Sequence, residues 1–181
     1  MNKKMAIVCS LLAVVVLLSF APVKRKIDFV EYDLPNGLHV ILHEDHTTPN
    51  VAVTVLYHVG SKNEDTARTG FAHFFEHLLF EGSENIARGE YDNYVENAGG
   101  ALNANTSFDR TFYFEVLPSN YLEMGLWLES ERMLHAKVDQ IGVETQRKVV
   151  MEEKRQRIDN RPYASWIGEL YKRAFSEHPD K

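Results

Sequence analysis

The chain has 181 residues, of which 44% are hydrophobic, so it is long enough for one globular domain with a buried core. Its 26 acidic and 20 basic residues give a net charge of −6, and it has no basic patch interleaved with aromatic residues, which argues against nucleic acid as a partner. The single cysteine, Cys9, lies in an apolar N-terminal run, so disulfides and cysteine ligands are not expected in the rest of the chain.

Residues 1–21 resemble a secretory signal peptide. A basic Lys3-Lys4 pair precedes the apolar run Met5–Leu18, and Ser19-Phe20-Ala21 resembles a small-x-small cleavage site. We therefore expect export to the periplasm or the extracellular space. The apolar run is short for a bilayer-spanning helix. Because Pro22 directly after the expected cut is unfavourable for signal peptidase, an uncleaved signal that anchors the chain in the inner membrane is the alternative, and only then would the chain contact a membrane.

Residues 22–30 are expected to form a solvated N-terminal arm, and residues 31–181 a globular domain that begins with strands. Phe29–Leu34 and Leu38–His43 flank a Pro-Asn-Gly sequence, which is typical of the tight turn of a β-hairpin. Val51–Val59 predicts a further strand, in the centre of a sheet.

Three histidines, His39, His43 and His46, lie in or just after the predicted hairpin. His39 and His43 would share one face of an extended strand, but His46 lies beyond the expected end of that strand. We therefore interpret them as side chains of an exposed hairpin edge, and not as a metal site.

The sequence His73-Phe74-Phe75-Glu76-His77 lies within an apolar stripe of helical spacing. Residues four apart on a helix lie one turn apart and point the same way, so His73 and His77 can bind one metal ion. Glu76 then lies close enough to act on a metal-bound water. The order H-x-x-E-H is that of the inverzincin zinc peptidases.

Leu102–Ser107 predicts a strand, and the overlapping segment Ala101–Thr106 contains two asparagines, which are poor strand formers. A strand that tolerates them is often an edge strand, and an edge strand can bind an extended peptide by β-augmentation. An ordinary polar edge without a ligand is the alternative. A second strand is predicted at Thr111–Leu117. Along the chain, one helix is predicted before these two strands, at Glu90–Asn97, and three after them, at Tyr121–Leu134, Gln140–Ile158 and Tyr163–Phe175.

A catalytic zinc ion usually takes three protein ligands, so the two histidines need a third. The long helix predicted near residue 150 offers Glu152 and Glu153, although most charge-rich helices are simply solvated. Adjacent residues on a helix point about 100° apart, so only one of the two can face the motif helix. Spacing alone leaves both open.

Three segments together resemble the pitrilysin/insulinase family of zinc metallopeptidases, and within it the bacterial processing-peptidase-like members. They are the H-x-x-E-H helix, the segment Asn97–Ala104, and the later Arg-x-Val-Val-x-Glu-Glu-x-Arg sequence that begins at Arg147. The resemblance runs from about Tyr32 to the C-terminus. It implies that residues 31–181 are the N-terminal catalytic domain of such a peptidase.

The resemblance also implies roles for individual residues. His73 and His77 match the zinc histidines, Glu76 matches the general base, and Glu153, six residues after Arg147, matches the third ligand. Asn103 and Ala104 match residues that bind substrate along the edge strand. Many relatives carry an auxiliary glutamate where this chain has Gln146, so the resemblance leaves open whether that position has a role beside the metal.

The expected function is therefore that of a zinc-dependent metalloendopeptidase that acts on peptides or unfolded polypeptides, with Zn²⁺ as the cofactor. Family members pair this domain with a second homologous domain, and the chain ends soon after the predicted ligand helix. We expect a partial sequence, C-terminally truncated, which alone has little or no activity. The alternative is a non-catalytic zinc-binding or interaction subunit that needs a second chain.

The order of the elements, strands first and then mostly helices, predicts an α+β fold. We expect an antiparallel-rich sheet with helices packed on one face, which the resemblance identifies as half of a clamshell metallopeptidase.

Overall fold

The structure is a computed structural model that describes residues 27–175. The described residues form two compact units, which divide between Thr48 and Pro49. The predicted signal peptide and most of the predicted arm lie outside the described residues and stay predictions. None of the helices within residues 27–175 is long and apolar enough to cross a membrane.

The first unit contains a β-hairpin of two short strands, β1 (Val30–Asp33) and β2 (His39–Leu42), paired antiparallel. The predicted turn is confirmed, but it is a loop of five residues in which only Gly37 has a positive φ, of 87°. Asn36 instead accepts a hydrogen bond from the Leu38 amide through its side chain, at 3.1 Å.

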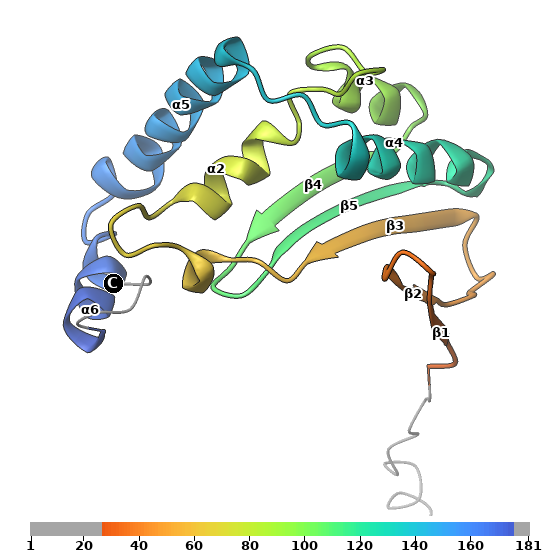
Figure 1. Ribbon diagram of the computed structural model, residues 1–181, viewed down its shortest axis with the longest axis horizontal. Helices are drawn as coiled ribbons and strands as arrows, with labels where there is room; N and C mark the ends of the chain where they lie inside the picture. The colour runs from red at the N-terminus through yellow and green to blue at the C-terminus, as the bar shows by residue number, and fades with distance from the viewer. Residues whose placement is uncertain (1–26, 176–181) are drawn as a thin grey trace, which may run out of the picture. The chain divides into compact units, whose positions relative to one another are not determined.

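The second unit is a three-stranded antiparallel sheet with helices on one face, as Figure 1 shows. The strand order is β3-β5-β4, so β5 is paired on both sides. The strands are β3 (Asn50–Tyr57), β4 (Ala101–Thr106) and β5 (Thr111–Pro118). The helices are α2 (Phe71–Leu78), α3 (Glu90–Asn97), α4 (Leu122–Leu134), α5 (Gln140–Lys154) and α6 (Trp166–Ala174).

The predicted α+β class is confirmed, and two details of the prediction are corrected. β3 lies at an edge of this sheet, and the central strand is β5, in which every second residue from Thr111 to Leu117 is buried. The helix predicted to reach Ile158 ends at Lys154 and continues as a π-helical turn, Arg155–Asp159. β4 is an edge strand of the sheet, as its asparagines predict.

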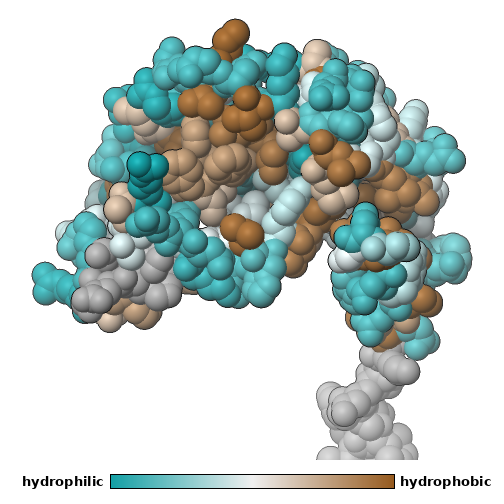
Figure 2. Space-filling view, viewed as in Figure 1, coloured by the Kyte–Doolittle hydropathy of each residue, from teal (hydrophilic) through white to brown (hydrophobic). Residues whose placement is uncertain are grey.

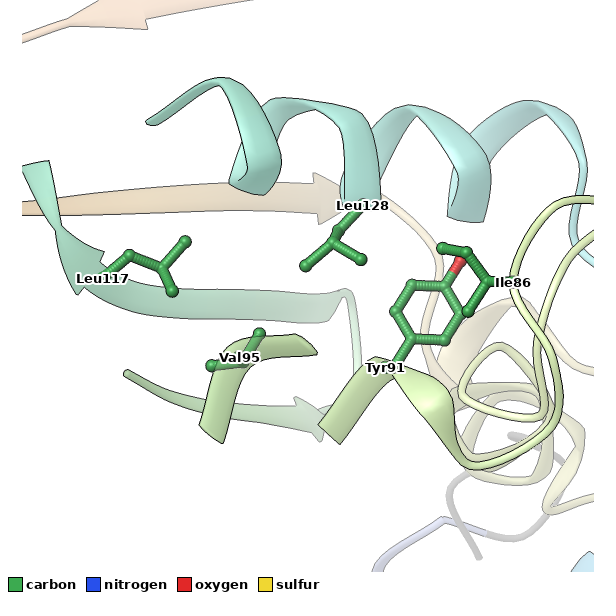
Figure 3. Close-up of a cluster of buried hydrophobic side chains, with 5 residues drawn as sticks. All are labelled: Ile86, Tyr91, Val95, Leu117 and Leu128. Atoms are coloured by element: carbon green, nitrogen blue, oxygen red, sulfur yellow. The ribbon is translucent and has the colours of Figure 1, made fainter. Parts of the chain in front are cut away.

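The core lies between the sheet and helices α3 and α4 (Figure 3). Its fully buried members are Ile86, Tyr91, Val95, Leu117 and Leu128. They come from four separate parts of the chain, and burying each large side chain stabilises the fold by about 1.5–3 kcal/mol. Apolar side chains also remain on the surface near α2 (Figure 2), where Phe71 and Phe75 are about half exposed.

Beside this core lies a buried charged cluster. The Arg132 guanidinium is stacked against the rings of Phe80, Tyr91 and Tyr113, with its central carbon 4.4–4.7 Å from the ring centres. Its Nε donates to both carboxylate oxygens of Glu129, at 3.0 and 3.2 Å. The arginine charge is therefore compensated without water.

Glu115 on β5 is also buried, and its neighbour is the Glu129 carboxylate. Burial, reinforced by that like charge, raises the pKa of Glu115 to about 9. The folded chain therefore holds this carboxyl in its protonated form at neutral pH, whereas an unfolded glutamate is ionised.

Replacing Glu115 by glutamine should stabilise the fold at alkaline pH. Folding takes up a proton between pH 4.5 and about 9, so wild-type stability should fall as the pH rises through that window. Glu115→Gln is already neutral, so its advantage over wild type should be near zero below pH 4.5 and grow by up to about 1.4 kcal/mol for each pH unit inside the window. Urea unfolding across this pH range measures the difference. Glu123→Gln, an exposed change on α4, is the control, and an equal pH dependence in wild type and Glu115→Gln would refute the account.

Candidate metal centre

Helix α2, which carries the H-x-x-E-H sequence, is fixed at its N-terminus by one side chain. The two carboxylate oxygens of Glu64 accept hydrogen bonds from the Gly70 and Ala72 amides, each at 2.6 Å. These amides have no partner within the helix, and a negative charge at a helix N-terminus also interacts favourably with the helix dipole.

The C-terminal end of α2 is held by the buried cluster. Arg132 donates to the Leu79 carbonyl at 2.8 Å, and the Tyr113 hydroxyl donates to the Glu76 carbonyl at 3.3 Å. Burial raises the pKa of Tyr113 far above its ordinary value, so this hydroxyl stays protonated. Both donors reach carbonyls of the last turn, next to Glu76 and His77.

Helix α5 packs beside α2 and supplies the third member of the site. His73 Nε2 and His77 Nε2 lie 3.3 Å apart, and Glu153 Oε2 lies 3.5 and 3.3 Å from them. Ligand atoms bound tetrahedrally to zinc at 2.0–2.1 Å lie about 3.3 Å from one another. These three are the metal-binding group found among residues 27–175, and their spacing fits one zinc ion.

The two oxygens of Glu153 have different surroundings. Oε1 is paired with Arg157 at 2.6 Å, whereas Oε2 is buried and has no hydrogen-bond donor among the described residues. A buried carboxylate oxygen without a donor is costly, and a cation between it and the two imidazoles would remove that cost. Glu152 points elsewhere, is half exposed and pairs with Arg155 at 3.3 Å. The geometry therefore places Glu153, and not Glu152, in the group of side chains that could hold a metal ion.

The three clustered side chains line a cavity of about 540 Å³, and Glu76 lines the same cavity. It is not among the three clustered donors, and Thr106 of β4 donates a hydrogen bond to its Oε2. Asn103 and Ala104 line this cavity as well, so the edge strand and the metal group face one space. A second, apolar cavity of about 490 Å³ lies on the other side of α2, and the two cavities share Glu76.

His77 has a partner on its second ring nitrogen. Its Nδ1 lies 3.2 Å from Oε1 of Gln146 on α5. The geometry thus supports a role for position 146 that the sequence left open, because an amide oxygen accepts a hydrogen bond from imidazole as a carboxylate would.

Thr106 and Arg157 also contact the site, although nothing in the sequence predicted it. The only sequence signal for Arg157 is its spacing of four residues from Glu153, which is common on solvated helices. Thr106 becomes a partner of Glu76 only because the sheet register sets β4 beside α2. The hairpin histidines have separate partners, Asp33 for His39 and the Asp28 carbonyl for His43, which agrees with their interpretation as edge side chains.

Comparison with known proteins gives one family. Residues 39–181 match the profile described as "Insulinase (Peptidase family M16)". A protein named zinc protease PqqE from Helicobacter pylori is 40% identical over 149 residues, which are 81% of this chain and 33% of that protein. The beta subunit of the mitochondrial-processing peptidase of Blastocladiella emersonii is 30% identical over 145 residues, 80% of this chain and 31% of that subunit.

Solved structures agree with the fold. A protease from Helicobacter pylori superposes with a TM-score of 0.81 at 36% identity, over 86% of this chain and 37% of that one. Pitrilysin superposes with a TM-score of 0.66 at 23% identity, over 74% of this chain and 15% of that one, which supports the fold alone. The chain thus spans about a third of the length of the curated relatives described above.

Single substitutions of the two adjacent glutamates should show which of them binds the metal. Glu153→Gln should weaken zinc binding by at least about 100-fold. Loss of a residue that only hydrogen-bonds to a metal ligand usually costs less than this. Glu152→Gln, the matched control, should bind zinc as wild type does, because its carboxylate faces Arg155. Competition with a chelator of known affinity measures both constants. The reverse result would transfer the ligand role to Glu152.

Proposed function

Because the chain belongs to the insulinase family, peptidase family M16, we propose that it is the zinc-binding catalytic part of a metalloendopeptidase. Its substrates would be peptides or unfolded polypeptides. The observation that carries the proposal is that the His73–His77–Glu153 triangle, Glu76 and the edge strand β4 all border one cavity.

The donor set supports zinc as the cofactor. Two imidazole nitrogens and one carboxylate oxygen are a known ligand set of catalytic zinc, which leaves a fourth position open. When bound, zinc would act as a Lewis acid that polarises the scissile carbonyl and lowers the pKa of a water molecule towards 7. His73, His77 and Glu153 would hold the metal, and Arg157 pairs with one Glu153 oxygen while the other faces the histidines.

Glu76 is the proposed general base. It lies three residues after His73 on α2, so its carboxylate is near the metal but does not belong to the donor triangle. Thr106 binds Oε2, which fixes the carboxylate and leaves Oε1 to accept the proton of the attacking water. The same carboxyl then passes the proton to the leaving amine.

The edge strand is the proposed substrate platform. β4 is hydrogen-bonded to β5 on one side only, so its other side can pair with an extended peptide. Pairing through the backbone requires an extended substrate, which favours peptides and unfolded chains over folded proteins. Asn103 and Ala104 would lie beside the scissile bond, because they line the metal cavity.

A second homologous domain, on the same or another chain, is the proposed partner that closes over the substrate. The chain spans a third of its relatives' length, and one wall alone holds a peptide poorly for reaction. A non-catalytic zinc-binding subunit is the rival proposal. The position of Glu76 favours catalysis, because a carboxylate beside the metal but outside the ligand triangle adds nothing to metal binding.

Glu76→Gln should keep zinc and lose peptidase activity by about 10²- to 10⁴-fold, the usual contribution of a general base. Zinc content and cleavage of an unfolded polypeptide are measured together, on this chain combined with a second homologous domain. Glu96→Gln, an exposed change on α3, is the control and should leave both unchanged.

The same assay tests the proposed partner, since the lone chain should show little chelator-sensitive cleavage. Loss of zinc in Glu76→Gln would make Glu76 a ligand, and full activity would remove it from the mechanism. Robust cleavage by the lone chain would show that one domain suffices.

A further inference from the structure

A chain of polar contacts leads from His77 away from the metal group into the protein. His77 Nδ1 lies 3.2 Å from Oε1 of Gln146, and Nε2 of the same amide donates to Glu81 Oε1 at 2.5 Å. Glu81 follows α2 in the chain and is buried, with a side chain only 5% exposed. One amide therefore bridges a histidine and a buried carboxylate.

The chemistry of this contact gives it one direction. An ionised carboxylate only accepts hydrogen bonds, so Glu81 fixes which end of the Gln146 amide is the NH₂ group. The amide oxygen must then face His77, and an oxygen only accepts. His77 therefore carries its proton on Nδ1, and its Nε2 presents a lone pair towards His73 and Glu153.

Glu81 is itself paired with an arginine that connects it to the N-terminus of the ligand helix α5. Its Oε2 pairs with Arg88 Nε at 2.5 Å, and Arg88 Nη2 donates to Asp139 at 2.8 Å. Asp139 caps the N-terminus of α5 by accepting from the Gly142 amide, also at 2.8 Å. The cap of α5 and the partner of His77 thus belong to one connected network.

Gly142 shows how closely this network is packed. A β-carbon at that position would lie 3.3 Å from both Cγ and Oε2 of Glu81, and 3.4 Å from Arg88. The absent side chain leaves room for the buried carboxylate beside α5. Glu81 is therefore held in place by its neighbours and cannot simply turn away from Gln146.

We propose that Gln146 and Glu81 are a pair of positioning residues that set the tautomer and orientation of His77 for metal binding. The inference rests on the proposed zinc site. It adds the groups that determine which ring nitrogen of His77 faces the metal. A glutamate at position 146 in the same conformation would set a second carboxylate against Glu81, and the repulsion between the like charges favours the amide at this position. The negative charge that orients His77 is therefore the Glu81 carboxylate, which acts through the Gln146 amide between them.

Exchanging the two side chains tests this pair. Gln146→Leu removes the oxygen that accepts from His77 Nδ1. It should weaken zinc binding by about 10- to 100-fold, the usual cost of losing a hydrogen-bond partner of a metal ligand. Glu81→Gln frees the amide to turn, and Gln146→Glu creates the like-charge pair, so each should weaken binding by roughly 10-fold. The double variant Glu81→Gln/Gln146→Glu restores one donor and one carboxylate and should return to within about 3-fold of wild type.

Nitrogen NMR of the imidazoles in the metal-free chain supplies a readout that loss of packing would not reproduce. Wild type and the double variant should show His77 protonated on Nδ1, and Gln146→Leu should show a mixture of tautomers. Gln140→Leu, which removes an exposed amide from the same helix, is the control and should change neither tautomer nor affinity. Far-UV circular dichroism checks that each variant is folded.

The outcomes separate this inference from the function proposed above. Zinc binding that survives in His73→Ala or His77→Ala would overturn the zinc site itself. Loss of zinc in those variants, with wild-type affinity in Glu81→Gln and Gln146→Leu, would overturn only the positioning pair. A double variant that binds no better than Gln146→Glu, or a wild-type His77 protonated on Nε2, would also overturn it.

Discussion

The packing of α2 against α5 is the constraint on which the site depends, because neither helix alone carries all three donor atoms. α2 brings two imidazoles and α5 brings one carboxylate, and their ligand atoms lie within 3.5 Å of one another. A small slide of one helix would open this triangle. The fold opposes such a slide with Glu64 at one end of α2 and with Arg132 at the other.

Three polar side chains orient the residues of the site, whereas Glu64 and Arg132 anchor the helix α2 itself. Thr106 binds the Glu76 carboxylate, Arg157 binds Glu153, and Gln146 binds His77. Each occupies one atom of its partner and leaves another atom free to face the cavity. The site is in this way oriented before any ligand arrives, which reduces the reorganisation needed at the moment of reaction. Of the three donor atoms in the triangle, Glu153 Oε2 is buried without a hydrogen-bond partner among the described residues, and a cation would satisfy it.

Much of this arrangement could be predicted from the sequence, and the rest depends on pairings that local patterns do not encode. Helical spacing placed His73, Glu76 and His77 on one turn, and the asparagines of Ala101–Thr106 indicated an edge strand. Spacing could not choose between Glu152 and Glu153, because that choice depends on which face of α5 meets α2. The Gln146 contact was missed since it joins residues 69 positions apart. Likewise, the alternation of Val51–Val59 identifies a strand but not its place in a sheet, which the pairing with β5 decides.

The central claim is that two imidazoles and one carboxylate of this chain bind a single zinc ion. X-ray absorption at the zinc edge, on the chain loaded with one equivalent of zinc, tests it most directly. The account predicts two imidazole nitrogens at about 2.0–2.1 Å and a carboxylate oxygen at about 2.0–2.2 Å. A shell with fewer than two imidazoles, or one made of water oxygens alone, would contradict it.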